Sequence, residues 1–167
     1  MRSQTIAPTS AAKMTAKVTT ETSIIPLPIV FATSWKAIFL ASTGANATSR
    51  LPSLKICFAH GGGSFAFWLG RVNNAWHKRH DVIGTSQYPP AHYLGRFYVD
   101  SVVFDERALR LLVDTVGADR VLVGSDYPYP LGERPAGGLV RKAGFLDDAT
   151  RDMILAGNAR TFLGGAP

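Results

Sequence analysis

The sequence predicts an α/β fold, because three short apolar segments alternate with helical patterns from Leu51 onward. The segments 54–60, 96–102 and 120–126 are typical of strands that are buried on both faces of a parallel sheet. Amphipathic stretches of helical period lie between and after them. An alternation of strand and helix that is repeated three times requires at least three consecutive β-α units.

Two of the helices can be delimited by their capping residues. The helix after the second strand candidate has apolar residues at helical spacing, Asp105 at its N-cap and Gly117 at its end. The last helix begins at Asp147 or Asp148 and ends at Gly164. These signals predict helices that connect and follow the strands.

Composition restricts the class of protein. With 167 residues the chain can form one domain with a hydrophobic core, and 46% hydrophobic with 18% charged residues is typical of a globular protein. The single cysteine, Cys57, excludes an intrachain disulfide and suits a reducing compartment such as the cytosol. Because Cys57 lies within an apolar segment, we expect a small core residue there and not a nucleophile.

The net charge of +6 does not indicate a nucleic-acid partner, because the basic excess lies mainly at one end of the chain. Residues 1–50 hold five Lys and Arg against one Glu, whereas residues 51–167 hold thirteen against eleven acidic residues. A nucleic-acid-binding surface would need a concentrated basic stripe, and residues 51–167 show none. We therefore expect no nucleic acid among the partners.

The first 50 residues differ from the rest in amino-acid composition and hydrophobic pattern. Residues 1–23 are rich in Ser, Thr and Ala, which is compatible with an organellar transit peptide, a disordered extension or an N-terminus that is not natural. Residues 24–43 are apolar, but two prolines and a lysine interrupt them, so no membrane span is expected. This stretch predicts a broken strand or helix that packs on another element.

Residues with chemical potential lie at or near the ends of the three strand candidates. His60 follows the first, Asp100 lies near the end of the second, and Asp126 follows the third. In β-α units the chemistry sits where the carboxyl ends of parallel strands meet. The sequence therefore predicts a functional site at this edge of the sheet.

His60 precedes three glycines, and this run has three interpretations. In lipases and esterases an HGGG segment supplies an oxyanion hole, but that fold also needs a G-x-S-x-G nucleophile turn, which the chain lacks. His60 is otherwise a reactive histidine at a strand end, with glycines that let the backbone turn tightly. The third interpretation is a structural histidine in a glycine-rich turn.

Asp126 and Arg71 also leave alternatives open. Asp126 lies in the segment GSDYPYP and is either a metal ligand, a general base or an ordinary turn residue. Arg71 lies two turns into the helix after the glycines, where a surface arginine is the ordinary interpretation.

Four motifs of the chain occur together in a set order. They are LKICFAHGGGSFAFWLGR (54–71), YLGRFYVDS (93–101), DRVLVGSDYPYPLGE (119–133) and ILAGNARTFLG (154–164). In order and spacing they resemble the C-terminal part of the amidohydrolase superfamily, most closely the family of 2-amino-3-carboxymuconate-6-semialdehyde decarboxylases. The resemblance extends over about residues 51–164.

This resemblance implies a metal-dependent (β/α)8 barrel, usually with zinc, that removes CO2 from an unsaturated or aromatic carboxylic acid. It implies that His60 is the catalytic histidine and that Asp126 both binds the metal and handles protons. Arg71 resembles the arginine that such enzymes extend to the substrate carboxylate of a neighbouring subunit, which implies a homodimer. Tyr129 stands where a phenylalanine is common and is expected beside the substrate. A cytoplasmic location follows from the same analogy.

The chain departs from the family in ways that limit these expectations. No histidine precedes His60, so His60 and Asp126 supply at most two of the three protein ligands of a catalytic zinc. Only three of eight barrel units are recognisable, which predicts the C-terminal portion of an incomplete barrel over residues 51–167, preceded by an atypical leader over 1–50.

Three expectations follow for the chain on its own. It should bind zinc weakly or not at all, and it should expose the sheet edge where a preceding barrel strand would pair, which favours aggregation. By the resemblance its function is that of a metal-dependent carboxy-lyase that is incomplete in this chain. The alternatives are a metal-dependent hydrolase of the same superfamily and a non-catalytic remnant.

Overall fold

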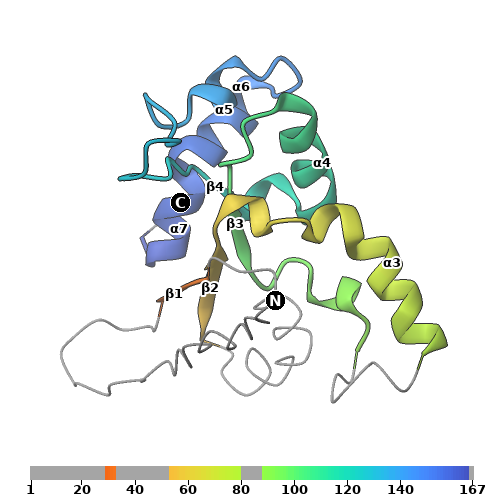
Figure 1. Ribbon diagram of the computed structural model, residues 1–167. Helices are drawn as coiled ribbons and strands as arrows, with labels where there is room; N and C mark the ends of the chain where they lie inside the picture. The colour runs from red at the N-terminus through yellow and green to blue at the C-terminus, as the bar shows by residue number, and fades with distance from the viewer. Residues whose placement is uncertain (1–28, 33–52, 80–87, 166–167) are drawn as a thin grey trace, which may run out of the picture.

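The computed structural model describes residues 29–32, 53–79 and 88–165. Four parallel strands form one sheet in the order β1-β2-β3-β4, as Figure 1 shows. They are β1 (Ile29–Ala32), β2 (Lys55–Phe58), β3 (Tyr98–Asp100) and β4 (Val121–Leu122). Strands that are neighbours in sequence are also parallel neighbours in the sheet, and from β2 onward helices connect them. Repeated β-α units produce this arrangement.

The three strands predicted from the sequence are confirmed, but each is shorter than its apolar segment. β2 ends at Phe58, two residues before His60, and β4 ends at Leu122, four residues before Asp126. Both polar residues lie beyond the paired part of their strands, with φ angles of 57° and 58° that differ from those of a strand. The functional candidates therefore lie in loops that rigid strands hold.

The sheet has one strand that the sequence left undecided between strand and helix. β1 pairs with β2 in parallel, with Ile29 opposite Lys55 and Ala32 opposite Phe58. The expectation of an open edge beside β2 is therefore wrong, because β1 covers it. The segment IVFA supplies the β-branched and aromatic residues that favour an extended backbone.

The helices of the described part follow β2, β3 and β4. They are α3 (Phe65–Lys78), α4 (Glu106–Val116), α5 (Gly138–Lys142), α6 (Asp148–Asp152) and α7 (Asn158–Leu163). A π-helical turn, η4 (Met153–Gly157), joins α6 to α7 into one rod. In Figure 1, α3 extends away from the strands, whereas α4 and α7 lie beside them.

The caps of α4 are those that the sequence predicts. The Asp105 carboxylate accepts hydrogen bonds from the backbone N–H groups of Arg107 (2.8 Å) and Ala108 (3.1 Å). Gly117 ends the helix with a φ of 91°, which suits glycine. The N-cap satisfies donors that have no partner inside the helix, and this sets where α4 begins.

The rod α6–η4–α7 has similar ends. The Asp147 carboxylate accepts from the Thr150 N–H at 2.7 Å, and Gly164 ends the rod in a left-handed conformation. Lys55 Nζ donates to the carbonyls of Thr161 (2.9 Å) and Phe162 (2.8 Å). This lysine therefore donates to carbonyls in the last turn of α7 and ties that helix to the start of β2.

Two hydrophobic clusters lie on the two faces of the sheet. Ile56 and Phe58 belong to the larger cluster, and Cys57 between them belongs to the smaller one with Leu122 and Phe162. This alternation follows from the two-residue period of a strand. Five side chains of the larger cluster have no exposed surface: Val99, Leu109, Val121, Val140 and Ile154.

Within residues 29–32, 53–79 and 88–165, each helix is too short or too polar to cross a membrane.

Candidate functional site

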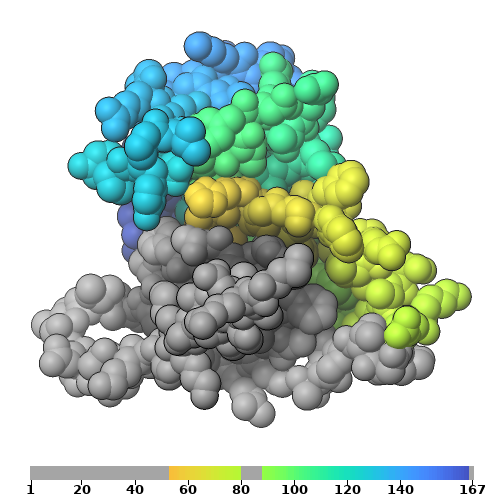
Figure 2. Space-filling view, viewed as in Figure 1, coloured from red at the N-terminus to blue at the C-terminus, as the bar shows by residue number. Residues whose placement is uncertain are grey.

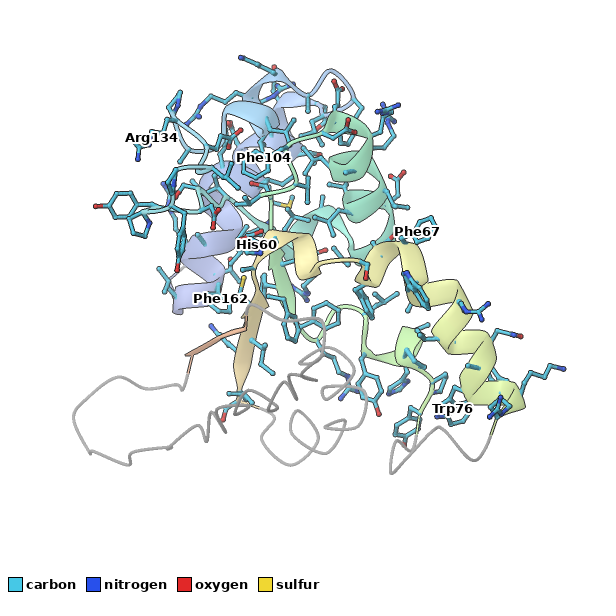
Figure 3. The ribbon with its side chains drawn as sticks, viewed as in Figure 1. His60, Phe67, Trp76, Phe104, Arg134 and Phe162 are labelled. Carbon is cyan, nitrogen blue, oxygen red and sulfur yellow. The ribbon has the colours of Figure 1, made fainter. Side chains whose placement is uncertain are left out.

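The residues that follow β2 and β4 meet at one edge of the sheet. His60 lies just beyond the end of β2 in Figure 3, where Phe67 and Trp76 mark the course of α3 away from this edge. The Nε2 atom of His60 lies 3.2 Å from Oδ1 of Asp126. The sequence predicted that these strand ends come together, and the structure places the two side chains in hydrogen-bonding contact.

The two members of this pair differ in their contact with solvent. The His60 side chain is 49% exposed and that of Asp126 is 18% exposed. An imidazole that contacts a carboxylate through one nitrogen and is partly exposed can exchange a proton with a molecule that reaches it. The arrangement is therefore suited to proton transfer.

Both members of the pair have a strained backbone. The φ angles are 57° at His60 and 58° at Asp126, in the left-handed region that residues with a Cβ rarely adopt. Phe104, in the loop after β3, has a φ of 55° and is the third residue of this kind among the described non-glycine residues. Such strain clusters at functional sites, because the surrounding structure must hold it in place.

The turn that carries His60 depends on its glycines. His60, Gly61 and Gly62 form a 3-10 turn, and the φ angles of Gly61, Gly62 and Gly63 lie between 61° and 72°. A Cβ on Gly61 would lie 2.5 Å from Cγ1 of Val103, closer than van der Waals contact allows. Glycine at this position therefore lets the turn lie directly against the segment after β3.

The loop that carries Asp126 is held by its own hydrogen bonds. Glu133 N–H donates to the Ser125 carbonyl at 2.8 Å, and the Glu133 carboxylate accepts from Gly137 N–H at 2.8 Å. Tyr129 N–H donates to the Asp126 carbonyl at 2.9 Å, and its side chain is 64% exposed. This loop protrudes from the surface, in cyan, in Figure 2. The structure thus places Tyr129 close to Asp126 along the loop.

Arg71 lies on α3 and is not part of this contact. Its guanidinium carbon lies 5.9 Å from the centre of the Trp68 ring, and the residue is exposed. Within 53–79 and 88–165, no hydrogen bond or ion pair joins Arg71 to His60 or Asp126. Arg71 is therefore exposed on α3 and takes no part in the His60–Asp126 contact.

Cys57 lies in β2, and its thiol is buried and unreactive. It is 2% exposed, and burial, followed by the charge of Asp100, raises the pKa of its thiol from 9.0 to about 12. A thiol of this kind stays protonated at physiological pH, and the thiolate is the nucleophilic form. The expectation that Cys57 is a core residue is confirmed.

The metal-ligand chemistry of the described residues is incomplete. His60 and Asp126 offer one nitrogen and two carboxylate oxygens, but no group of three or more His, Cys, Asp or Glu side chains gathers within the described ranges. A catalytic zinc normally takes three protein ligands. The residues described here therefore do not by themselves fit a complete catalytic metal centre.

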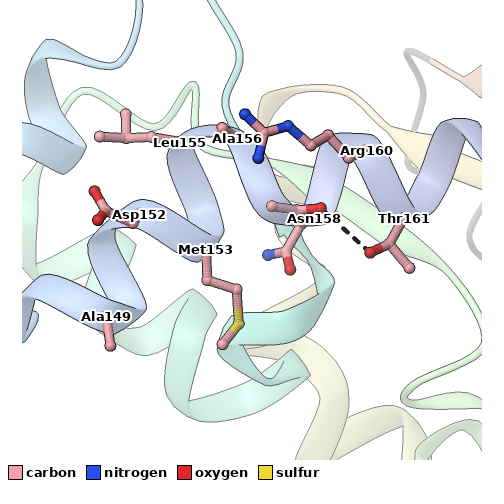
Figure 4. Close-up of a pocket in the computed structure, with 9 residues that line it drawn as sticks. Ala149, Asp152, Met153, Leu155, Ala156, Asn158, Arg160 and Thr161 are labelled. Atoms are coloured by element: carbon pink, nitrogen blue, oxygen red, sulfur yellow. Dashed lines mark hydrogen bonds between the residues drawn. The ribbon is translucent and has the colours of Figure 1, made fainter. Parts of the chain in front are cut away.

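A cavity of about 630 Å³ lies along α6, η4 and α7, away from the His60–Asp126 pair. Figure 4 shows Asp152, Met153, Arg160 and Thr161 among its lining residues. None of its lining residues belongs to the loops after β2, β3 or β4. This cavity is separate from the candidate site.

Sequence reasoning missed what lies between the two loops. The sequence marks Asp100 only as a polar residue near a strand end and assigns no role to Ser101 or Phe104. Asp100 Oδ1 accepts a hydrogen bond from Gly61 N–H, and Ser101 Oγ accepts one from Gly124 N–H. Polar residues at the end of an apolar strand are the signal that singles out Asp100 and Ser101.

Comparisons with known proteins agree with the fold and the motifs. The family model described as amidohydrolase matches residues 39–165. The chain is 45% identical over 119 residues to the 2-amino-3-carboxymuconate-6-semialdehyde decarboxylase of Dictyostelium discoideum, a match that covers 71% of this chain and 33% of the relative.

Solved structures are similar at lower sequence identity. The 5-carboxyvanillate decarboxylase of Sphingomonas paucimobilis matches with a TM-score of 0.66 and 25% identity, over 78% of this chain and 39% of that one. A dihydroxybenzoic acid decarboxylase of Polaromonas, solved with manganese and the inhibitor 2-nitroresorcinol, matches with a TM-score of 0.63 and 25% identity, over 76% and 38%.

The chain thus spans about a third of the length of the curated relatives it matches. The prediction of an α/β fold that corresponds to the C-terminal portion of a (β/α)8 barrel is confirmed, because the parallel units align with part of each amidohydrolase structure.

Proposed function

This chain belongs to the amidohydrolase family, and from that premise we propose that it carries part of the catalytic site of a metal-dependent carboxy-lyase. The reaction would be non-oxidative decarboxylation of an unsaturated or aromatic carboxylic acid. The observation that carries the proposal is the 3.2 Å contact between His60 and Asp126 at the edge where parallel strands end. The decarboxylase names of the similar proteins support this reaction over hydrolysis.

In this proposal the side chains have distinct roles. Loss of CO2 leaves an electron pair on carbon, and the half-exposed His60 ring could exchange the required proton with the reacting molecule. Asp126 holds the His60 ring in that orientation and offers a carboxylate oxygen as a metal ligand. Tyr129 would contact the substrate, because it lies in the same loop as Asp126 and its ring is exposed.

The proposal extends to a metal and to a neighbouring subunit. The metal of this proposal is a divalent cation, zinc by the family resemblance, which Asp126 could help to hold, although the described residues do not complete its ligand set. Such a cation would supply Lewis-acid chemistry. The planar guanidinium of Arg71 suits a carboxylate, and its place on exposed α3 suits a substrate in a second subunit of a homodimer. A small-molecule carboxylate is then the substrate.

Two coarser features complete the proposal. The change in composition supports a division into an atypical segment over 1–50 and a barrel portion over 51–167, with β1 of the first segment as a further strand of the sheet. A cytoplasmic location suits the single, buried and unpaired Cys57, because disulfides are rare in that compartment.

A hybrid enzyme tests this function. Residues 53–165 replace the matching segment of the Dictyostelium relative, and CO2 release from 2-amino-3-carboxymuconate-6-semialdehyde is measured beside the full chain alone. Release above the uncatalysed rate by the hybrid supports the proposal. A hybrid that unfolds cooperatively and binds metal but releases no CO2 contradicts it and favours a non-catalytic protein.

The hydrolase alternative is tested with the same hybrid. Amide and ester substrates are offered under the same conditions, and turnover of these without CO2 release would favour hydrolysis.

A further inference from the structure

The end of β3 touches both loops of the candidate site. Asp100 and Ser101 are consecutive there, and together they are called the β3 bracket below. Asp100 Oδ1 accepts from Gly61 N–H at 2.9 Å and from Val102 N–H at 3.1 Å. The second bond is local, whereas the first joins residues 39 positions apart.

The bond to Gly61 acts on the residue next to His60. Because Gly61 follows His60 directly, fixing its N–H fixes the peptide plane that the two residues share. A carboxylate is a strong acceptor for backbone N–H groups, so it can hold a turn that the strained φ of His60 would otherwise disfavour. The local bond to Val102 N–H in turn fixes the Asp100 side chain.

Ser101 binds the loop after β4 in the same way. Its side chain is 1% exposed, and Oγ accepts from Gly124 N–H at 3.2 Å, two residues before Asp126. The contact is tight, because a Cβ on Gly124 would lie 2.5 Å from Cγ2 of Val102 and 2.9 Å from Cβ of Asp100. The chain that leaves β4 therefore lies directly against the bracket.

From these contacts we infer that Asp100 and Ser101 are positioning residues that set the separation of His60 and Asp126. Asp100 holds the turn after β2, Ser101 holds the loop after β4, and the single peptide bond between them fixes the two anchor points relative to each other. This inference rests on the proposed function only for its catalytic consequence. The geometric claim stands on the hydrogen bonds of β3.

Amide exchange measured by NMR on the full chain tests the geometric claim. Asp100→Ala removes a hydrogen bond to a charged group, so the Gly61 amide is expected to exchange at least about tenfold faster. Asp100→Asn keeps the oxygen acceptor and is expected to stay within about twofold of the original rate. Ser101→Ala is expected to accelerate Gly124 and to leave Gly61 unchanged.

The matched control is Asp105→Ala, which removes a carboxylate that also accepts from two backbone N–H groups but at the start of α4. It is expected to leave the exchange of Gly61 and Gly124 unchanged. The ¹⁵N shift of His60 Nε2 is followed in the same samples and should move in Asp100→Ala and not in Asp105→Ala. Unchanged Gly61 exchange and an unmoved His60 signal in Asp100→Ala would overturn the inference.

Two further measurements keep the test decisive. If Asp100→Ala does not fold, Ser101→Ala decides, and unchanged Gly124 exchange there would overturn the bracket. In the hybrid enzyme, Asp100→Ala is expected to lower kcat at least about tenfold with little change in KM, because the proton-transfer geometry and not substrate binding is altered. An inactive parent hybrid would count against the proposed function, while the NMR result would still decide the bracket.

Discussion

His60 and Asp126 are 66 residues apart in the chain, yet Nε2 of the first lies 3.2 Å from Oδ1 of the second. Their backbones share the same strained, left-handed conformation. The strands β2 and β4 that precede them are not neighbours, because β3 lies between them in the sheet. Strand pairing alone therefore does not bring the two residues into contact. The contact therefore depends on two loops that bend toward each other over the end of β3, and each loop has a hydrogen bond to that end.

Replacing Asp126 is expected to remove metal from the hybrid enzyme. Metal content measured by mass spectrometry should approach about one divalent ion per chain in the parent and fall toward zero in Asp126→Ala, because the site loses a ligand. Asp152→Ala, which removes an exposed carboxylate from α6, is the matched control and should retain the metal.

Zinc binding by the full chain alone provides a second test of the metal site. The described residues gather no third ligand, so weak or absent zinc binding is expected. A tightly held, stoichiometric zinc in the chain alone would contradict this expectation.

Cys57 is expected to react with a thiol reagent only after unfolding. Its thiol is buried and its pKa is raised to about 12, so at pH 8 Ellman's reagent should label the native chain far more slowly than the denatured chain. Fast labelling of the native chain would show that the strand is not packed as described.

The same pKa predicts a dependence of stability on alkaline pH. The folded state keeps the Cys57 proton between 9.0 and about 12, whereas the unfolded state loses it, so the free energy of unfolding should fall as pH rises through this window. The slope approaches about 1.4 kcal/mol per pH unit from this residue. Denaturant unfolding of Cys57→Ala should show a smaller fall over the same range.

Gly61→Ala is expected to destabilise the fold and to displace His60. The φ of 61° is unfavourable for alanine, and the new Cβ would lie 2.5 Å from the Val103 side chain. A left-handed residue with a Cβ costs roughly 1–2 kcal/mol before the steric clash is counted.

Gly70→Ala is the control for this substitution. Gly70 lies inside α3 with nothing within 4 Å of an added Cβ, so the change should stabilise the helix by about 0.5–1 kcal/mol. Thermal unfolding of the two variants should therefore shift in opposite directions. An equal shift in the same direction would contradict the conformational account of the turn.

Leu109→Ala tests the larger hydrophobic cluster. Leu109 has no exposed surface, and its truncation is expected to lower the free energy of unfolding by about 2–5 kcal/mol. Leu111→Ala on the same helix removes the same atoms from a side chain that is 42% exposed, and it should cost much less. Similar losses in the two variants would contradict the packing of α4 through the face that carries Leu109.

The sequence was sufficient for the elements whose signals are local. The capping carboxylates Asp105 and Asp147 and the terminal glycines Gly117 and Gly164 mark helix ends by short-range hydrogen bonds, and the structure has the helices there. The strands could be located but not delimited, because the same apolar residues continue into the turns. The conformation that ends β2 depends on contacts with the segment after β3, which the local sequence does not contain.

The position of the site could be predicted from the sequence, but the hydrogen bonds that hold it could not. Parallel strand ends meet at one edge, so His60 and Asp126 could be placed near each other from the alternation of strands and helices alone. The β3 bracket could not, because its bonds depend on the lateral register in which Val99 lies opposite Val121 and Phe58. Register follows from packing across the whole sheet.

The most direct test of the central claim is CO2 release by the hybrid enzyme with His60→Ala, compared with His92→Ala. His92 is exposed and stacks on Tyr88 at a centroid distance of 4.2 Å, so its loss should leave the rate within about twofold of the parent, because surface substitutions have small effects. Loss of His60 is expected to lower kcat by about 10²–10⁴-fold, the range of general acid–base catalysis. Equal rates in the two variants would contradict a catalytic role for the His60–Asp126 pair.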